Sequence, residues 1–382
     1  MAFAYSATAQ DGYEDVLSRI EANSTTLQVY RKQMEAQKLV NRTGIFLPDP
    51  EVEFAYLWGN TPVAGDRTDF KVTQSFDFPT VYSQKNRISN LENSNAELLY
   101  KAERIALLLR AKQICIELIY YNALAKEYEL RVHNAERIAA AYRAKLEKGE
   151  ANIIESNKVQ LNLTSLQNEA TKIETEKTIL LSELKRMNGG QDIVFNQYSY
   201  YRGIIPDSFD KWYAQAESKS PTLQYVSTQI KVKEEEVRLN RASGLPKFSA
   251  GYMSERLLGE RFQGITVGIS VPLWENKNRV RQAQSQLSAS QSLFEDSKIA
   301  YYTRLQGLYA KVVDLQQSSL KHRAALSSFN NEVLLKKALD AGEISLLNYL
   351  LEIEYFYDAL RGVLDTEKKL ELSLAELSAM EL

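Results

Sequence analysis

GITVGISVPLWENKNR, residues 264–279, alternates apolar with small or polar side chains until it reaches a proline. A period of two indicates a β-strand with one apolar face, because successive side chains of a strand point to opposite faces. Val267, Ile269 and Val271 share the apolar face, and Trp274 follows shortly after it. Most of the remaining chain lacks glycine and proline over long stretches, which favours helices. The sequence therefore predicts a mainly α-helical protein with a small β part.

Three other stretches alternate in the same way. Residues 51–58, 70–78 and 247–254 each place apolar or aromatic side chains on one face and polar or small ones on the other, with Gln74 as the one clear exception. The polar face carries charged residues that are candidates for lining a water-filled lumen: Glu51, Glu53, Lys71 and Asp77. The candidates for contact with lipid are Val267, Ile269, Val271 and Trp274.

The length of these strands favours a membrane location. Strands of about 9 to 11 residues can cross a bilayer at a tilt, and aromatic residues gather at both membrane interfaces. Aromatic residues lie near the predicted strand ends, at Tyr56, Trp58, Tyr82 and Trp274. Four strands cannot close a barrel in lipid, so a shared barrel of 12 strands from three chains is expected. The alternative is two hairpins half-buried on the protein's own helices.

The helical stretches are too long for a compact domain. From about Ser83 to Lys148 there is neither proline nor glycine, and a helix of this length would extend roughly 100 Å. Apolar residues follow a heptad spacing, with one predicted seam at Leu91, Leu98, Ile105 and Ile119 and the other at Ala102, Leu109, Ile116, Ala123 and Leu130. Gly149 and Gly342 mark the expected chain reversals. Two long antiparallel coiled-coil hairpins are therefore predicted.

Three sequence markers recur in the same order and indicate an internal duplication. NRTGIFLPDP (41–50) is echoed by NRASGLPKF (240–248), Pro79 by Pro272, and LEKGEANIIE (146–155) by LDAGEISLLN (339–348). The first repeat is predicted over 11–190, with a β-hairpin at 48–79 and a helical tip near 149. The second repeat is predicted over 216–382, with a β-hairpin at 245–273 and a helical tip near 342. A linker band over 191–215 joins the two repeats.

Composition excludes several functional classes. The 47 basic and 49 acidic residues nearly balance, giving a net charge of −2, so nucleic acid is not an expected partner. The single cysteine, Cys115, sits in an apolar helical run that favours a buried position. His133 and His322 form no metal-ligand pattern, and no nucleophile or phosphate-binding loop is recognisable. We expect no enzyme, no cofactor and no bound metal.

The first ten residues allow two interpretations. Ala7-Thr8-Ala9 is a small-x-small sequence typical of a signal peptidase site, which makes residues 1–10 either the remainder of an export signal or an ordinary frayed end. No stretch of 18 apolar residues is present, and the nearest candidate, 105–124, contains Arg110, Lys112 and Glu117. A transmembrane helix is therefore not expected.

VPLWENKNR (271–279) and AGEISLLNYLLEIEYFYDAL (341–360), together with the Leu-Pro before each hairpin, resemble the TolC-type outer-membrane efflux protein family. The resemblance extends from about residue 11 to the last residue of the chain. It implies a homotrimer in the outer membrane of a Gram-negative bacterium, with a 12-stranded barrel continued by an α-helical barrel across the periplasm. The implied function is a passive exit duct that works with a periplasmic adaptor and an inner-membrane pump.

The same resemblance suggests roles for individual residues. Gly149, Glu150, Gly342 and Glu343 match the tip turns that contact the adaptor. Some relatives narrow the tunnel entrance with aspartates six and nine residues after the second tip glycine. Here those positions are Asn348 and Leu351, with Glu352 close by, so Asn348 and Glu352 are the entrance candidates.

Two classes of function remain open from the sequence. The first is the export channel, whose cargo is drugs, metal ions or proteins. If the cargo is drugs or metal ions, the resemblance implies a pump of the resistance-nodulation-division type as its partner. The second is a structural or tethering coiled-coil protein whose amphipathic hairpins pack on a partner rather than in lipid.

Overall fold

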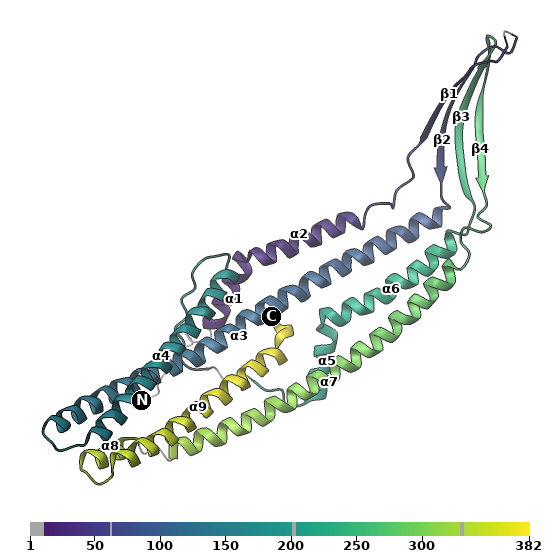
Figure 1. Cartoon of the computed structure of the whole chain (residues 1–382). Coiled ribbons are helices and arrows are strands. Elements are labelled where there is room, and N and C mark those ends of the chain that lie inside the picture. The colour runs from purple at the N-terminus through teal and green to yellow at the C-terminus, as the bar shows by residue number, and fades with distance from the viewer. Residues whose placement is uncertain (1–10, 62, 201–203, 329–331) are drawn as a thin grey trace, which may run out of the picture. The chain divides into compact units, whose positions relative to one another are not determined.

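The computed structural model describes residues 11–61, 63–200, 204–328 and 332–382 (Figure 1). The segment 1–10, interpreted above as a signal remainder or a frayed end, lies outside the described residues. The chain divides into two compact units. The helical unit contains the segment up to Val29 together with Glu103–Ala216 and Tyr302–Leu382, and the strand-bearing unit contains Tyr30–Ala102 and Glu217–Tyr301.

Long helices make up most of the described chain. In order they are α1 (Asp11–Asn23), α2 (Thr25–Val40), α3 (Pro79–Glu147), α4 (Ile153–Met187), α5 (Phe209–Lys219), α6 (Pro221–Ala242), α7 (Arg279–Ser328), α8 (Glu332–Asp340), α9 (Leu346–Leu377) and a short 3-10 helix, η1 (Ala379–Glu381). Helix α3 has 69 residues and ends one residue before the predicted limit. It begins at Pro79, a position where the missing N–H of proline costs no helical hydrogen bond.

The core of the helical unit joins α1, α3 and α4. Ile20 of α1, Ile114 and Leu118 of α3, and Leu184 of α4 are fully buried in one apolar cluster. Phe195, from the non-helical segment that follows α4, closes this cluster. The burial of these side chains outweighs the weak amphipathic pattern of α3, because packing supplies most of the stability of a protein helix.

The heptad seam predicted for α3 is wrong toward the end of the helix. Leu130, a predicted seam residue, is 56% exposed, whereas Leu124 and Tyr128 are buried against Ile173 of α4. A straight helix drifts relative to a seven-residue repeat, and α3 also contacts α9 through Leu364. A residue that faces two neighbouring helices is buried whether or not it follows the heptad.

The strand-bearing unit contains a single antiparallel sheet (Figure 1). Its strands are β1 (Glu51–Leu57), β2 (Arg67–Phe76), β3 (Lys247–Leu257) and β4 (Glu260–Ser270), in the order β1-β2-β3-β4. Strands β2 and β3, which lie far apart in the sequence, pair over the whole length of β2, from Arg67↔Leu257 to Phe76↔Phe248. Strand β4 ends at Ser270, before the predicted limit, because Pro272 has no N–H to donate to a ladder.

Candidate functional site: a two-faced sheet and two helical turns

One face of the sheet is mainly apolar, and its apolar rows cross all four strands. The register aligns Val52, Val72, Tyr252 and Ile265 in one row. A second row places Phe76 beside Phe248 and Ile269. Residues directly opposite each other on antiparallel strands share a face, so these rows form an apolar region of the sheet. Toward the β3–β4 turn the same face becomes polar on β3 and β4, with Ser254 opposite Gln263 and Arg256 opposite Arg261. On β4 this surface is open to its surroundings, since Ile265 is 85% and Val267 82% exposed.

The opposite face is polar and carries ion pairs. The Lys71 ammonium lies 3.9 Å from a carboxylate oxygen of Glu53, and the two residues face each other in the β1–β2 register. The Arg67 guanidinium lies 2.9 Å from Asp69 and 3.1 Å from Glu255. Glu51 stands opposite Thr73 on this face and is exposed. The lumen candidates Glu51, Glu53 and Lys71 are therefore brought together on one face.

Asp77 and Gln74 differ from the simple alternation. Asp77 lies just beyond β2, and its carboxylate is 3.6 Å from the Lys85 ammonium on α3. It belongs to the junction between strand and helix rather than to the ladder. The Gln74 amide, which the pattern places among apolar residues, donates hydrogen bonds to the carbonyl oxygens of Pro48 (2.7 Å) and Ser75 (3.0 Å). These bonds explain how an amide is accommodated on the apolar face.

Both predicted glycine turns are present with the same geometry. Gly149 has a φ of +73° and Gly342 one of +76°, in the left-handed region where a side chain is disfavoured. In each turn the glutamate after the glycine donates its N–H to a helix carbonyl five residues back, Glu150 to Lys145 (2.8 Å) and Glu343 to Ala338 (2.9 Å). This bond, with the glycine N–H bonded three residues back, is the Schellman ending of a helix.

The residue three positions after each turn glycine is the N-cap of the next helix. Asn152 accepts from the N–H of Glu155 at the start of α4, and Ser345 accepts from the N–H of Asn348 at the start of α9. Such caps satisfy N–H groups that have no partner within the helix. Asn348 and the entrance candidate Glu352 are both exposed. Apolar side chains are also exposed beside the turns, at Ile153, Ile154, Leu347 and Leu351.

Several solved structures match this architecture along nearly the whole chain. The outer membrane channel CmeC of Campylobacter jejuni gives a TM-score of 0.78 at 16% identity, covering 97% of this chain and 85% of that chain. CusC, studied for folding and transmembrane channel formation, gives 0.79 at 13% identity over 99% and 95%. The outer membrane protein VceC of Vibrio cholerae gives 0.78 at 12% identity over 96% and 95%.

The chain has the fold of the TolC-type outer-membrane channels. At identities of 12% to 16%, the fold is what these proteins share with it. No family model matches the chain, and no curated protein matches it in sequence. The resemblance inferred from short stretches such as VPLWENKNR is therefore confirmed through the fold.

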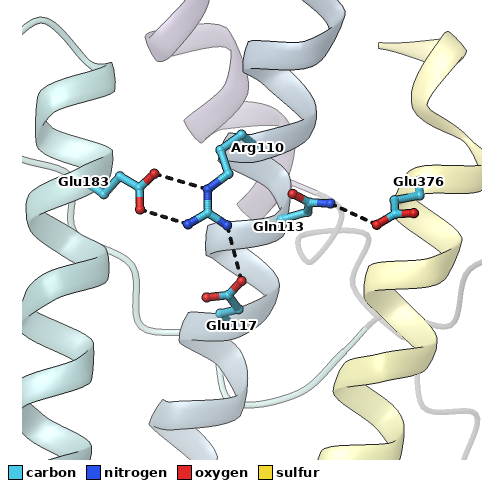
Figure 2. Close-up of polar contacts among 5 residues, drawn as sticks. All are labelled: Arg110, Gln113, Glu117, Glu183 and Glu376. Carbon is cyan, nitrogen blue, oxygen red and sulfur yellow. Dashed lines mark hydrogen bonds and ion pairs between the residues drawn. The ribbon is translucent and has the colours of Figure 1, made fainter.

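The helices of this TolC-type fold are joined by polar contacts that the sequence did not reveal. The Arg110 guanidinium on α3 forms a bidentate ion pair with Glu183 on α4, with N–O distances of 3.1 and 2.9 Å. It also donates a hydrogen bond to the Glu117 carboxylate (Figure 2). Gln113, on the same helix, donates to Glu376 on α9. Helix α3 therefore has polar contacts with a helix of each hairpin.

Cations stacked on tyrosine rings form a second set of contacts between α3 and α9. The Lys368 ammonium lies 3.9 Å from the centre of the Tyr120 ring, and the Arg131 guanidinium lies 3.7 Å from that of Tyr357. Arg361 also donates a hydrogen bond to the Tyr128 hydroxyl. Such pairs attract through the negative face of the ring. The only signal in the sequence is a scatter of Tyr, Lys and Arg within apolar stretches.

The described residues show neither a metal-binding cluster nor a reactive thiol. No group of three or more metal-binding side chains comes together among the residues that were placed. Burial raises the pKa of the Cys115 thiol to about 12, which leaves it protonated and unreactive at neutral pH. Within the same described ranges, no helix combines the length and apolar composition needed to cross a membrane.

Proposed function

We propose that this chain is one subunit of a trimeric outer-membrane channel that serves as the exit duct of an efflux system. In this proposal three copies of the sheet close a 12-stranded barrel, and the helical hairpins continue it as a tunnel into the periplasm. The outer membrane of a Gram-negative bacterium is the proposed location. The duct itself is passive, and the driving force comes from the partners.

The apolar face of the sheet is the observation that carries this proposal. Soluble proteins rarely expose a continuous apolar surface of this extent, because contact with water is unfavourable. Here apolar rows cross four strands, and β3 and β4 have 11 residues each, enough to cross a bilayer at a tilt with the charged rows near their turn at one membrane surface. Lipid satisfies an apolar face of these dimensions, and the TolC-type fold is found in outer membrane channels.

The polar face then lines the lumen. Glu51, Glu53 and Lys71 would meet water and solutes there, as polar side chains inside such barrels do. In a strand with lipid on one side and water on the other, the two faces must alternate along the strand. The register supports this alternation over the part of the sheet from Val52 and Val72 to Tyr252 and Ile265, and on to Phe76 and Ile269.

The turns are the proposed contact points with the other components. Exposed apolar side chains beside Gly149 and Gly342 offer a surface on which a periplasmic adaptor can pack, with Glu150 and Glu343 at its rim. Asn348 and Glu352 are proposed to face the tunnel entrance. The expected pump is of the resistance-nodulation-division type, and the expected cargo is small molecules or metal ions.

The shared geometry of the two turns also supports a tandem duplication. Each turn has a glycine in the left-handed region and a helix cap three residues later. We propose repeats over 11–190 and 216–382, joined by a band over 191–215. The two compact units each draw on both halves, as is expected when two similar halves assemble side by side.

Two lysine substitutions on adjacent residues of β4 test the proposal. Val267→Lys places a charge on the apolar face, which costs about 2–4 kcal/mol near the middle of a bilayer. Thr266→Lys is the matched control, because its side chain is on the polar face. We expect Val267→Lys to reduce the amount of protein recovered in outer-membrane fractions severalfold, and Thr266→Lys to leave that amount nearly unchanged.

The outcome also separates the channel from a coiled-coil scaffold. A scaffold protein would stay dispersed without detergent, and both lysine variants would fractionate like the unmodified chain. Equal effects of the two lysines, or recovery of the protein in the soluble fraction, would contradict the lipid-facing assignment. Ion conductance of the purified protein in a planar bilayer provides the second readout.

A further inference from the structure

The helical unit encloses a cavity of about 280 Å³ among α3, α7, α9 and the segment that follows α4. Leucines of α7 and α9 form its apolar wall, at Leu320, Leu364, Leu370 and Leu374. Ligand sites are typically concave and mostly apolar, with a few polar groups that select the ligand. The volume is at the small end for such sites, so a ligand of about ten heavy atoms is the appropriate size.

Two tyrosines contribute aromatic surface to this cavity. Tyr200 donates a hydrogen bond from its hydroxyl to the carbonyl oxygen of Ile116 (3.0 Å), which fixes its ring. Burial raises the pKa of this phenol, so it stays neutral. Tyr198 also lines the cavity, but the Lys126 ammonium lies 5.7 Å from its ring centre. Tyr200 is therefore the ring available to a bound cation.

The charged side chains that line the cavity leave one negative charge without a partner. Arg323 of α7 is neutralised by Glu367 of α9 in a two-pronged pair with N–O distances of 2.6 and 2.7 Å. Glu371 lies one turn further along α9, and no hydrogen bond or ion pair reaches its carboxylate from any residue placed in the structure. A partly buried carboxylate without a partner is costly, because burial removes its hydration.

Glu371 also lines a second cavity, which contains a lysine. This space of about 580 Å³ is lined by Glu371 together with Lys112 of α3, Tyr13 of α1 and Glu381 of η1. Lys112 favours the ionised form of Glu371 and Glu367 disfavours it, but neither is its hydrogen-bond partner. The carboxylate is thus left for a cation that enters the first cavity.

We propose that the cavity between α3, α7 and α9 is a binding site for a small organic cation, with Glu371 as its counter-ion and the Tyr200 ring as its aromatic wall. An ammonium group gains from the carboxylate and from the negative face of the ring, while its hydrocarbon part packs on the leucines. This inference concerns binding in the wall of the helical unit and does not depend on transport.

The charge of Glu371 makes this binding depend on pH. Burial raises the pKa of its carboxyl to about 7, with a smaller opposing effect of Lys112. Above this value the group is ionised and attracts the cation, and below it the group is neutral. We expect affinity to fall about tenfold between pH 8 and pH 6, since the ionised fraction falls by about that factor.

The test uses the full-length chain in a non-ionic detergent and benzyltrimethylammonium as the probe, followed by saturation-transfer NMR. We expect saturable binding at pH 8, and binding about tenfold weaker for Glu371→Gln. Glu376→Gln is the matched control, because Glu376 is on the same helix, contacts Gln113 and does not line the cavity. Phenylacetate, of similar size but opposite charge, is expected not to bind.

A second variant checks the balance of charge. Glu367→Gln removes the carboxylate that neutralises Arg323 beside the cavity. The positive charge of Arg323 would then repel the cationic probe, so the probe should bind to this variant more weakly than to the unmodified chain. Loss of folding does not confuse these results, because replacing a buried unpaired carboxylate with an amide is expected to raise the melting temperature at pH 8. Equal affinity of Glu371→Gln and the unmodified chain, or the absence of saturable binding at pH 8, would overturn the proposal.

Discussion

Glycine is required at the two turns because of the backbone conformation, not because a side chain would lack room there. An added Cβ would meet nothing within 4 Å at Gly149 or at Gly342, yet both have positive φ. We predict that Gly342→Val strains the turn by about 1–2 kcal/mol, since a β-branched side chain is disfavoured in the left-handed region. Export in cells that carry this variant should fall, while the helical content measured by circular dichroism stays the same.

Gly342→Asn is the control for this prediction. Asparagine tolerates the left-handed region better than any β-branched residue, and the open space around the Cβ accommodates it. Export should therefore be largely retained. If the valine and asparagine variants exported equally well, backbone strain at the turn would not be the relevant property.

The only cysteine should be unreactive in the folded protein. Cys115 is fully buried in the core between α1, α3 and α4, and the pKa of its thiol is raised to about 12. Because the thiolate is the nucleophile, a maleimide at pH 7 should label the native protein hardly at all and the denatured protein completely. Rapid labelling without denaturant would show that this core opens.

Two arginines of α3 should contribute very differently to the contacts between helices. The Arg131 side chain is 2% exposed and stacks on Tyr357 and Tyr128, whereas the Arg110 side chain is 42% exposed. We predict that Arg131→Leu destabilises the protein by about 2–3 kcal/mol, because it leaves Glu127 without its partner and the Tyr357 ring without its stacked cation. Arg110→Leu should cost less than about 1 kcal/mol, because water screens its pairs.

Thermal melting followed by circular dichroism checks this order. The Arg131 variant should melt several degrees below the Arg110 variant, which should stay close to the unmodified chain. A larger shift for Arg110→Leu would mean that its ion pair with Glu183 on α4 matters more than the stacking between α3 and α9. Figure 2 shows that pair and its position on α3.

The strands and helical turns could be predicted from the sequence because local rules determine them. Alternation predicted the faces of the strands except beside the β3–β4 turn, where Arg256 and Arg261 lie on the otherwise apolar face, and a glycine before a capping residue predicted each helical turn. The pairing of β2 with β3 joins residues that lie about half the chain apart, and alternation carries no information about such partners. The packing of α3 against both α4 and α9 likewise does not follow the predicted seam, which leaves Leu130 exposed.

The cavity beside Glu371 could not be predicted for the same reason. It is lined by residues of α3, α7, α9 and the segment after α4, and each of these shows an ordinary helical or linker pattern by itself. In the sequence, Glu371 is one of many glutamates on a predicted helix. Only the packing of the helices shows that Glu367 has a partner and Glu371 does not.

The order of the strands makes a prediction about assembly. In this sheet β1 and β4 are the end strands, and unpaired backbone groups at a sheet edge are not tolerated in lipid. Pairing β4 of one copy with β1 of the next removes all edges once a ring of identical chains closes. Two copies would give eight strands, whose interior is filled by side chains, whereas three give 12 and leave a lumen.

Light scattering with correction for bound detergent should therefore give three times the mass of one chain. Removal of detergent should aggregate the protein, since the apolar face of β4 would then meet water. The same preparation should conduct ions across a planar bilayer, even if its conductance is small, because the polar faces of three sheets enclose water. A monomer or dimer that stays dispersed without detergent would mean that another protein covers the apolar face, and the duct would be the wrong interpretation of its two-faced strands.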